Sequence, residues 1–292
     1  MNNTAFNQIN TTLEQIFDTL TEVPTFPKVV QKALKLLDDP NVTIKELEEV
    51  LKYDPAITAN ILKLTNSAHF ALPQQVTSLD TALALLGQNQ LRKILVASAS
   101  VAYFQKPLPG YGLSAIDIWT HSIGCAVIAE LLAKEFSFSE PSILFTAGIL
   151  HDIGKVILNL YVWSELDKIQ KIALEQDITF MEAEWEILGT DHAVIGSTLL
   201  KHWEFPAILY RAVRNHHDPD LYIQDDVSAI LSLANIMCAI LGIGVGYDSY
   251  RYVISEELIK KFDITNKTFN IFLVKSLKEM KKIKDILSIV TE

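Results

Sequence analysis

The sequence predicts an all-α fold. Apolar residues recur at helical spacing in one segment after another, and capping residues or prolines mark where those segments begin and end. No alternating apolar and polar run and no hairpin signal indicates a β-strand. With 292 residues, 49% of them hydrophobic, the chain is long enough to bury one large core or two smaller ones.

The first part of the chain is predicted to form short helices. The first ends before Pro40, and Thr43 and Glu46 have the spacing of a capping box for the second. Asp54 precedes a proline and is placed to cap the third. Gly87 is placed to end the fourth.

A stretch rich in proline and glycine, residues 106–114 (KPLPGYGLS), separates these short helices from a region of longer ones. We therefore expect a boundary near residue 106. Residues 116–246 contain most of the polar groups of interest. An apolar stripe from Phe269 to Leu287 then predicts a final amphipathic helix, which either packs on the body or serves a partner.

The charge and the cysteine content limit the partners and the compartment that we expect for the protein. The net charge of −10 disfavours nucleic acid as a partner, because an acidic surface repels phosphate backbones. Residues 259–292 carry eight lysines against four acids, which is typical of a solvated helix face. Two distant cysteines without a CxxC motif, and a first ten residues without a signal-peptide pattern, indicate the cytoplasm.

The stretch 227–247 has no charged residue and is long enough to span a bilayer. It contains serines and an asparagine, and its flanks are acidic, whereas a spanning helix usually has basic anchors. Glycines at 242, 244 and 246 are placed to end it early. We therefore predict a buried core helix and no membrane association.

Six of the seven histidines lie between His121 and His217. His151 and Asp152 follow an apolar run, where burying a polar pair without a partner is costly. A metal ion is one such partner, and imidazole with carboxylate suits divalent iron, manganese, zinc or cobalt. The alternative is a buried ion pair of Asp152 with Lys155, a lysine that could otherwise reach an anion over the site.

The other histidines have simpler alternatives. His121, one helical turn from Asp117 and from Cys125, could be a core histidine bonded to a neighbour. His192 follows a potential helix cap. His216 and His217 could be surface residues beside a turn, and His202 at a helix end is given no role in the site.

Together, these residues resemble the HD superfamily of helical, metal-dependent phosphohydrolases, and more closely its HDOD branch. In the first half, three segments resemble the N-terminal HDOD subdomain: PTFPKVVQKALKLLDDP, LKYDPAITANILKLTNSAHF and TSLDTALALLGQNQLRKILVAS. In the second half, three resemble the C-terminal subdomain: GILHDIGKVIL, GTDHAVIGSTLLKHWEFP and NHHDP.

The resemblance covers residues 18–250 and implies an HD-domain-like multi-helix fold with two packed helical subdomains. It divides the chain into a lead-in (1–17), an N-terminal HDOD subdomain (18–105), an HD-like subdomain with the metal site (106–250) and a C-terminal amphipathic tail (251–292). It also implies a bacterial, cytoplasmic protein of signalling and regulation. The ligand set it implies is His121, His151, Asp152, His192, His216 and His217, with one or two ions, and Lys155 as the residue that contacts a bound phosphate.

Two departures from the wider superfamily bear on catalysis. The position of its last aspartate ligand matches Asn235 here, and a neutral amide is a weaker ligand for a hard cation and cannot act as a base. The alternative is that Asn235 is a helix-capping or packing amide. The Gly-Tyr-Pro motif of cyclic-dinucleotide phosphodiesterases is missing, since DPDLYIQ follows His217.

Two functions follow as hypotheses. The first is a regulatory module with a structural metal centre that engages a protein partner, with no catalytic residue assigned. The second is a metal-dependent phosphohydrolase that acts on a nucleotide or cyclic nucleotide, in which a metal-bound water attacks and Lys155 stabilises phosphate charge. The sequence leaves the metal, the partner, the oligomeric state and the roles of Asp117 and Asn235 open.

Overall fold

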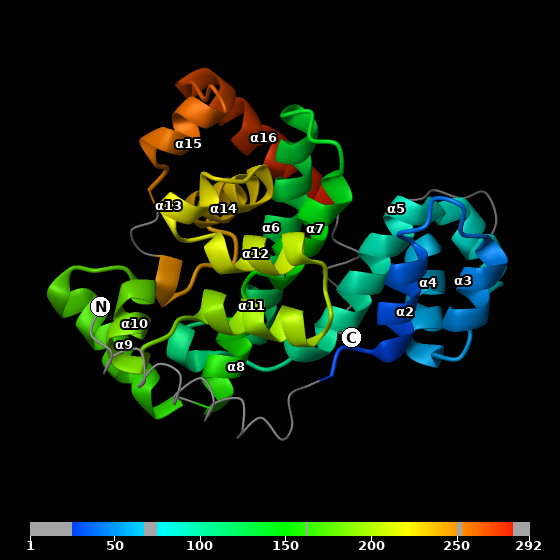
Figure 1. Cartoon of the computed structure of the whole chain (residues 1–292), viewed down its shortest axis with the longest axis horizontal. Coiled ribbons are helices and arrows are strands. Elements are labelled where there is room, and N and C mark those ends of the chain that lie inside the picture. The colour runs from blue at the N-terminus through cyan, green and yellow to red at the C-terminus, as the bar shows by residue number, and fades with distance from the viewer. Residues whose placement is uncertain (1–24, 67–74, 162, 250–252, 283–292) are drawn as a thin grey trace.

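The computed structural model describes residues 25–66, 75–161, 163–249 and 253–282, and the regular secondary structure of these residues is helical, with no strand. The predicted lead-in, 1–17, and the end of the predicted tail, 283–292, lie outside the described residues. A first group of helices forms one side of the molecule (Figure 1): α2 (Lys28–Leu36), α3 (Ile44–Leu51), α4 (Pro55–Thr65) and α5 (Leu79–Ser100).

The main body is built around α6, α7 and α14, and the 22-residue α5 of the first group is longer than any of these three. Its helices are α6 (Ala115–Glu135), α7 (Pro141–Leu150), α8 (Ile153–Tyr161), α9 (Trp163–Gln176), α10 (Phe180–Leu188), α11 (His192–His202), α12 (Ala207–Asn215), α13 (Pro219–Tyr222) and α14 (Asp226–Ile240). Two more, α15 (Glu256–Lys261) and α16 (Asn266–Lys282), lie above them in Figure 1. The prediction of an all-α fold is confirmed.

Local chemistry explains where several helices begin and bend. The predicted capping box exists at α3, where the Thr43 hydroxyl accepts from the Glu46 N–H at 3.3 Å and Glu46 accepts from the Thr43 N–H at 2.9 Å. Gly87 adopts φ 68° and breaks the regular geometry inside α5, because only glycine takes this conformation without strain. The predicted helix end is therefore a kink, after which α5 continues.

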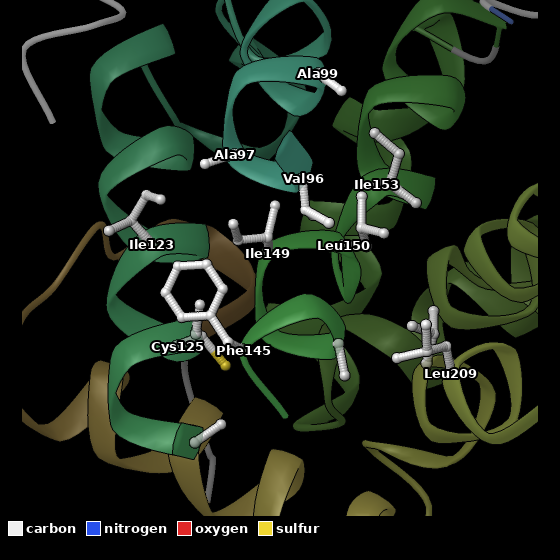
Figure 2. Close-up of a cluster of buried hydrophobic side chains, with 14 of the residues drawn as sticks. Val96, Ala97, Ala99, Ile123, Cys125, Phe145, Ile149, Leu150, Ile153 and Leu209 are labelled. Atoms are coloured by element: carbon white, nitrogen blue, oxygen red, sulfur yellow. The ribbon is translucent and has the colours of Figure 1, made fainter. Parts of the chain in front are cut away.

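The end of α5 passes into the main body. Figure 2 shows Val96 and Ala97 of α5 packed with Phe145 and Ile149 of α7, in a core that also includes Ile123 of α6. At the base of α2, the fully buried Phe26 ring contacts two aromatic rings that follow α11, those of Trp203 and Phe205, at centroid distances of 5.3 and 5.1 Å. One continuous hydrophobic core thus connects the first group of helices to the body.

Close backbone contact allows α6 and α7 to support the site. A Cβ on Gly148 would overlap the Ala126 backbone of α6, so only glycine allows α7 to approach this closely. Two segments, Ala115–Glu135 and Pro141–Leu160, are long and apolar enough to cross a membrane, but 67% and 83% of their apolar windows are buried inside the fold. That burial is typical of core helices, so they are weak evidence for membrane insertion.

The predicted core helix at 227–247 is confirmed. It corresponds to α14, which is buried along almost its whole length and ends at Ile240. Gly242 and Gly244 follow it with φ values of 69° and 58°, so the chain turns back toward α6. In α16, Phe272 and Ser276 are buried, whereas Leu277 is 46% exposed. The predicted last helix thus packs on the body at Phe272, and Leu277 of the same apolar stripe is exposed.

Candidate metal centre

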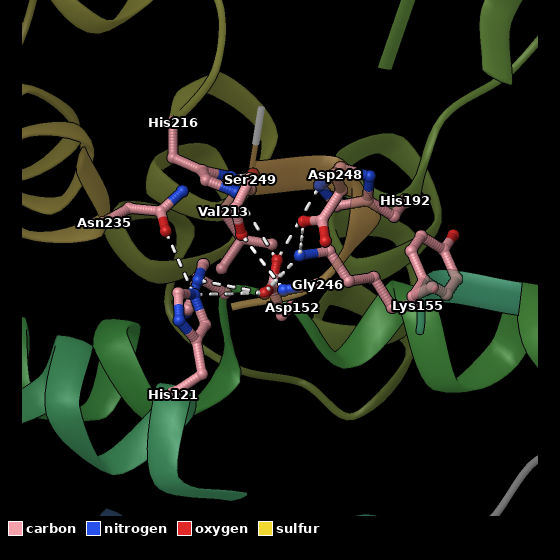
Figure 3. A network of polar contacts seen from close by, with 12 residues as sticks. His121, Asp152, Lys155, His192, Val213, His216, Asn235, Gly246, Asp248 and Ser249 are labelled. Atoms are coloured by element: carbon pink, nitrogen blue, oxygen red, sulfur yellow. Dashed lines mark hydrogen bonds and ion pairs between the residues drawn. The ribbon is translucent and has the colours of Figure 1, made fainter. Parts of the chain in front are cut away.

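The predicted site residues come from four parts of the main body and meet at one point (Figure 3). His121 lies in the middle of α6, and His151 with Asp152 forms the turn between α7 and α8. His192 is the first residue of α11, and the pair at 216 and 217 directly follows α12. His202, which was given no role, is exposed at the far end of α11.

Gly154 sets the distance between the HD turn and α11. A Cβ at this position would overlap the carbonyl oxygen of His192 and crowd the amide of Gly196. The absence of a side chain therefore allows α8 and α11 to pack backbone to backbone. This contact brings Asp152 and His192 close together.

Asp152 lies at the centre of the cluster and is completely buried. Its Oδ2 atom is 3.3 Å from His151 Nε2 and 3.5 Å from His121 Nε2. Its Oδ1 atom is 3.7 Å from His192 Nε2 and 3.9 Å from His216 Nε2. The carboxylate therefore faces two groups of imidazoles, one at each oxygen.

Three of these imidazoles are oriented by an acceptor at their other nitrogen. The Nδ1 atom of His151 is 2.7 Å from the Gly148 carbonyl, and that of His216 is 2.6 Å from the Val213 carbonyl. The His192 Nδ1 atom is 2.7 Å from a Glu184 carboxylate oxygen. Because a carbonyl or carboxylate can only accept, each Nδ1 carries the proton and donates.

The nitrogens that point inward have no hydrogen-bond partner. Nε2 of His151, His192 and His216 and Oδ1 of Asp152 are all buried without one among the residues that the structure describes. Such buried orphan atoms are rare in folded proteins. Imidazoles fixed through Nδ1 with a free Nε2 are the usual arrangement around a metal ion. The donor set at this point therefore fits a divalent cation.

Distances agree with that fit. Two ligand atoms that each lie about 2.1 Å from one ion are at most about 4.2 Å apart. The separations of 3.7 and 3.9 Å around Asp152 Oδ1 are too long for hydrogen bonds but lie within this limit. Ligand atoms of Asp152, His192, His216 and His217 lie within 4.8 Å of one another, and so do those of a second group, His121, His151 and Asp152.

His121 differs from the other imidazoles. Its Nδ1 is 3.0 Å from the Ile243 carbonyl, and its Nε2 is 3.0 Å from the side-chain oxygen of Asn235. Asn235 therefore contacts the cluster. Asp117 does not, since its carboxylate accepts from the Ser114 N–H at 3.0 Å and caps α6.

Lys155 is held inside the protein by two carboxylates. Its Nζ donates to Oδ2 of Asp152 and to Oδ2 of Asp248, each at 2.5 Å, and the residue is 1% exposed. The ion pair with Asp152, considered as an alternative from the sequence, is present. The role of Lys155 in contacting an anion stays a prediction, and such an anion would compete with both carboxylates for the amine.

The buried charges shift each other's titration. Burial acts to raise the pKa of Asp152, but His151 and Lys155 hold it well below its ordinary value of 3.8. Burial acts to lower the pKa of His151, but the Asp152 carboxylate raises it to about 10. Burial lowers the pKa values of His216 and His217 well below 6.5. An ion bound to His151 would thus displace a proton, whereas His216 and His217 are already neutral.

Three polar residues of the site were not predicted from the sequence: Tyr111, Glu184 and Asp248. Glu184 of α10 accepts hydrogen bonds from the His192 ring and backbone and, at 2.6 Å, from the Tyr111 hydroxyl. The sequence did contain a signal for Glu184. At helical spacing it lies one turn from Phe180 and from Leu188, on the buried face of the helix. Asp248 had been interpreted only as an acidic flank, and its approach to Lys155 depends on the turn after α14.

Known proteins support the fold. Residues 23–219 match the family model of the HDOD domain. An HDOD domain protein of unknown function from Geobacter sulfurreducens is 27% identical with a TM-score of 0.78, and the match covers 96% of this chain and 98% of that one. A candidate phosphohydrolase from Shewanella amazonensis is 24% identical, with a TM-score of 0.66 and coverage of 94% and 95%.

Other relatives are longer than the region they share with this chain. A candidate signal transduction protein from Marinobacter aquaeolei has a TM-score of 0.77 at 17% identity, with 99% of this chain and 66% of that chain covered. Uncharacterized proteins of Treponema pallidum and Bacillus subtilis (YuxH) are 22% and 26% identical over 211 and 142 residues, which are 70% and 48% of this chain. The chain spans only 39% and 32% of their lengths. Because the family model matches more than half of the sequence, this chain belongs to the HDOD family.

Proposed function

We propose that this protein is a regulatory module of bacterial cytoplasmic signalling, in which a divalent transition metal holds the helices of the main body together and the assembled surface binds a protein partner. The family and the names of similar proteins support the signalling role. The orphan atoms around Asp152 support the metal. No ordinary side-chain contact explains why three imidazoles and a carboxylate leave inward-facing atoms unpaired in a buried site.

Burial of most of the ligands is the observation that favours a structural role over a catalytic one. His151 and Asp152 are 0% exposed, and His192 and His216 are each 1% exposed. Catalytic metal sites keep an open position for water and substrate, whereas structural sites are closed. In addition, the amine suited to a phosphate is bound by two carboxylates. The residues are thus arranged to hold an ion rather than to expose one.

The ligands also determine which metals are expected. Imidazole nitrogens with one carboxylate oxygen suit iron, manganese, zinc or cobalt, and they suit calcium or magnesium poorly. The bound ion would supply cross-linking between helices. Since His151, His192 and His216 belong to different segments that an unfolded chain does not bring together, binding would stabilise the folded state.

Metal-dependent phosphohydrolysis of a nucleotide or cyclic nucleotide is the second candidate. The favouring observation is that His217, at the edge of the cluster, is only partly buried, so the Asp152–His192–His216–His217 group is the one nearest to solvent. In this function the metal would activate water. Asn235 weighs against it, because an amide occupies the position where the superfamily has a carboxylate.

Elemental analysis combined with thermal unfolding tests the proposal. We expect the purified protein to contain a transition metal, and a chelator to lower its Tm. Asp152→Ala should abolish both effects, whereas Asp167→Ala, which changes an exposed aspartate of α9, should abolish neither. No metal and no response to chelation would refute the metal centre. Turnover of nucleotide phosphates with manganese, iron, cobalt or zinc that depends on Asp152 would favour the second candidate.

A further inference from the structure

We infer that the centre holds one metal ion rather than two, bound on the Oδ1 side of Asp152, and that the ammonium of Lys155 takes the place of a second cation on the Oδ2 side. This inference rests on the proposed metal centre and specifies its occupancy. It starts from the two groups of imidazoles around one carboxylate, which by distance alone could each hold an ion.

The Oδ2 side already has a cation. Lys155 Nζ lies 2.5 Å from Asp152 Oδ2, and Asp248 holds the amine from its other side, also at 2.5 Å. An ammonium and a divalent ion that share one carboxylate oxygen would repel each other strongly in a buried site, where the effective dielectric constant is low. Lys155 is 1% exposed, so its amine is held away from solvent.

On the Oδ2 side only the Nε2 atom of His151 is without a hydrogen-bond partner among the described residues, whereas the other candidate ligands, His121 and Asn235, are occupied or weak. The two nitrogens of His121 face the Ile243 carbonyl and the Asn235 oxygen, both at 3.0 Å. The backbone that carries this carbonyl cannot withdraw easily, because Gly244 packs directly on the Asp117 carbonyl and on His121 in α6. Asn235 offers a neutral oxygen where a carboxylate would have neutralised part of the charge of the ion.

The Oδ1 side has the opposite character. Asp152 Oδ1 and the Nε2 atoms of His192 and His216 are buried without a hydrogen-bond partner in the described part of the chain, and the two nitrogens lie 3.7 and 3.9 Å from that oxygen. His217 adds a fourth ligand atom within 4.8 Å of the others. Glu184 fixes the His192 ring by accepting its Nδ1–H. Among the described residues, no hydrogen bond satisfies Asp152 Oδ1 or the Nε2 atoms of His192 and His216.

Buried charge also favours one ion. The Lys155 ammonium already places a positive charge between the carboxylates of Asp152 and Asp248. A divalent ion on the same side of Asp152 would add further positive charge among residues that are at most a few per cent exposed, which is costly.

Metal stoichiometry tests this inference on the full-length protein. After loading with excess zinc and removal of free metal, the wild type should retain one ion per chain. His216→Ala should lose it, whereas His121→Ala should retain it. Lys155→Met should bind two ions, because the competing ammonium is gone, while Lys155→Arg, which keeps the charge, should bind one.

The outcomes distinguish failure of the single-ion assignment from failure of the proposed metal centre. A wild-type protein that binds no zinc and shows no shift in Tm refutes the metal centre itself. Two ions in the wild type, or loss of the ion in His121→Ala with retention in His216→Ala, leave the metal centre intact and overturn the single-ion assignment. One ion in Lys155→Met overturns the role of Lys155. If Lys155→Met does not fold, the comparison of His121→Ala with His216→Ala still decides the side on which the ion binds.

Discussion

Glu184→Gln should weaken metal binding by about 10–100-fold, the usual effect of removing a group that supports a ligating imidazole. Glu184 is fully buried and accepts from His192 Nδ1–H at 2.7 Å, from His192 N–H at 3.1 Å and from the Tyr111 hydroxyl at 2.6 Å. Glutamine has the same shape, and its amide can donate to the Tyr111 oxygen while its carbonyl still accepts from His192. The substitution therefore removes the charge with little change in packing.

The charge matters because it raises the basicity of the ring. Burial acts to lower the pKa of His192, but the Glu184 carboxylate raises it above 6.5. Without that carboxylate, Nε2 is a poorer donor to a cation. A 10–100-fold loss of affinity corresponds to about 1.4–2.7 kcal/mol less metal-induced stabilisation at saturating metal.

Competition with a chromophoric chelator would measure the dissociation constant of the metal, and unfolding with and without metal would measure the stabilisation. Glu182→Gln is the matched control, because Glu182 lies on the same helix, is exposed and belongs only to the capping box of that helix. A folded Glu184→Gln protein with a dissociation constant within about twofold of the wild type would refute the reasoning.

Three further predictions concern stability. The metal-free protein should lose stability as the pH falls below about 6.5, by up to about 1.4 kcal/mol per pH unit for each of His216 and His217, because the unfolded chain then takes up protons that the folded chain, with its lowered pKa values, does not. Denaturant titrations in chelator between about pH 7.5 and 5.5 would measure this, and a flat profile would contradict it. Phe26→Ala should cost about 3–5 kcal/mol, since the fully buried ring joins the first helices to the body, whereas Leu85→Ala, at a 50% exposed position, should change the unfolding free energy by less than about 0.5 kcal/mol. Gly154→Ala should destabilise the protein by at least about 1–3 kcal/mol and lower its metal content, because α8 must move away from α11; a Tm and a zinc content equal to those of the wild type would argue against this contact.

Much of the fold was predictable from local signals. The capping box at Thr43, the irregularity at Gly87 and the buried helix before Gly242 were all read from short stretches of sequence, and each has its counterpart in the structure. Such signals are local because a cap or a glycine acts within one helical turn. Helical periodicity placed Leu277 in the apolar stripe of the last helix, but periodicity does not identify the element that covers a position, and Leu277 is exposed.

The candidate site was predictable in its residue types and unpredictable in its connections. A histidine and an aspartate after an apolar run indicate a buried polar centre, because burial without a partner is costly. The hydrogen-bond partners of His121 and the second carboxylate that holds Lys155 come from beyond residue 234, and the support for His192 comes from another helix. No local pattern links positions that are 93 or 114 residues apart.

By itself, the sequence determined an all-helical chain with a concentrated set of imidazoles and one carboxylate, since periodicity, caps and composition act over short distances. Only the tertiary structure decided which nitrogens point inward without a partner, which oxygen of Asp152 the Lys155 ammonium occupies and how completely the cluster is enclosed. The physical reason is that charge compensation in a buried site depends on distances across the fold, and those distances are set by the packing of helices far apart in the chain.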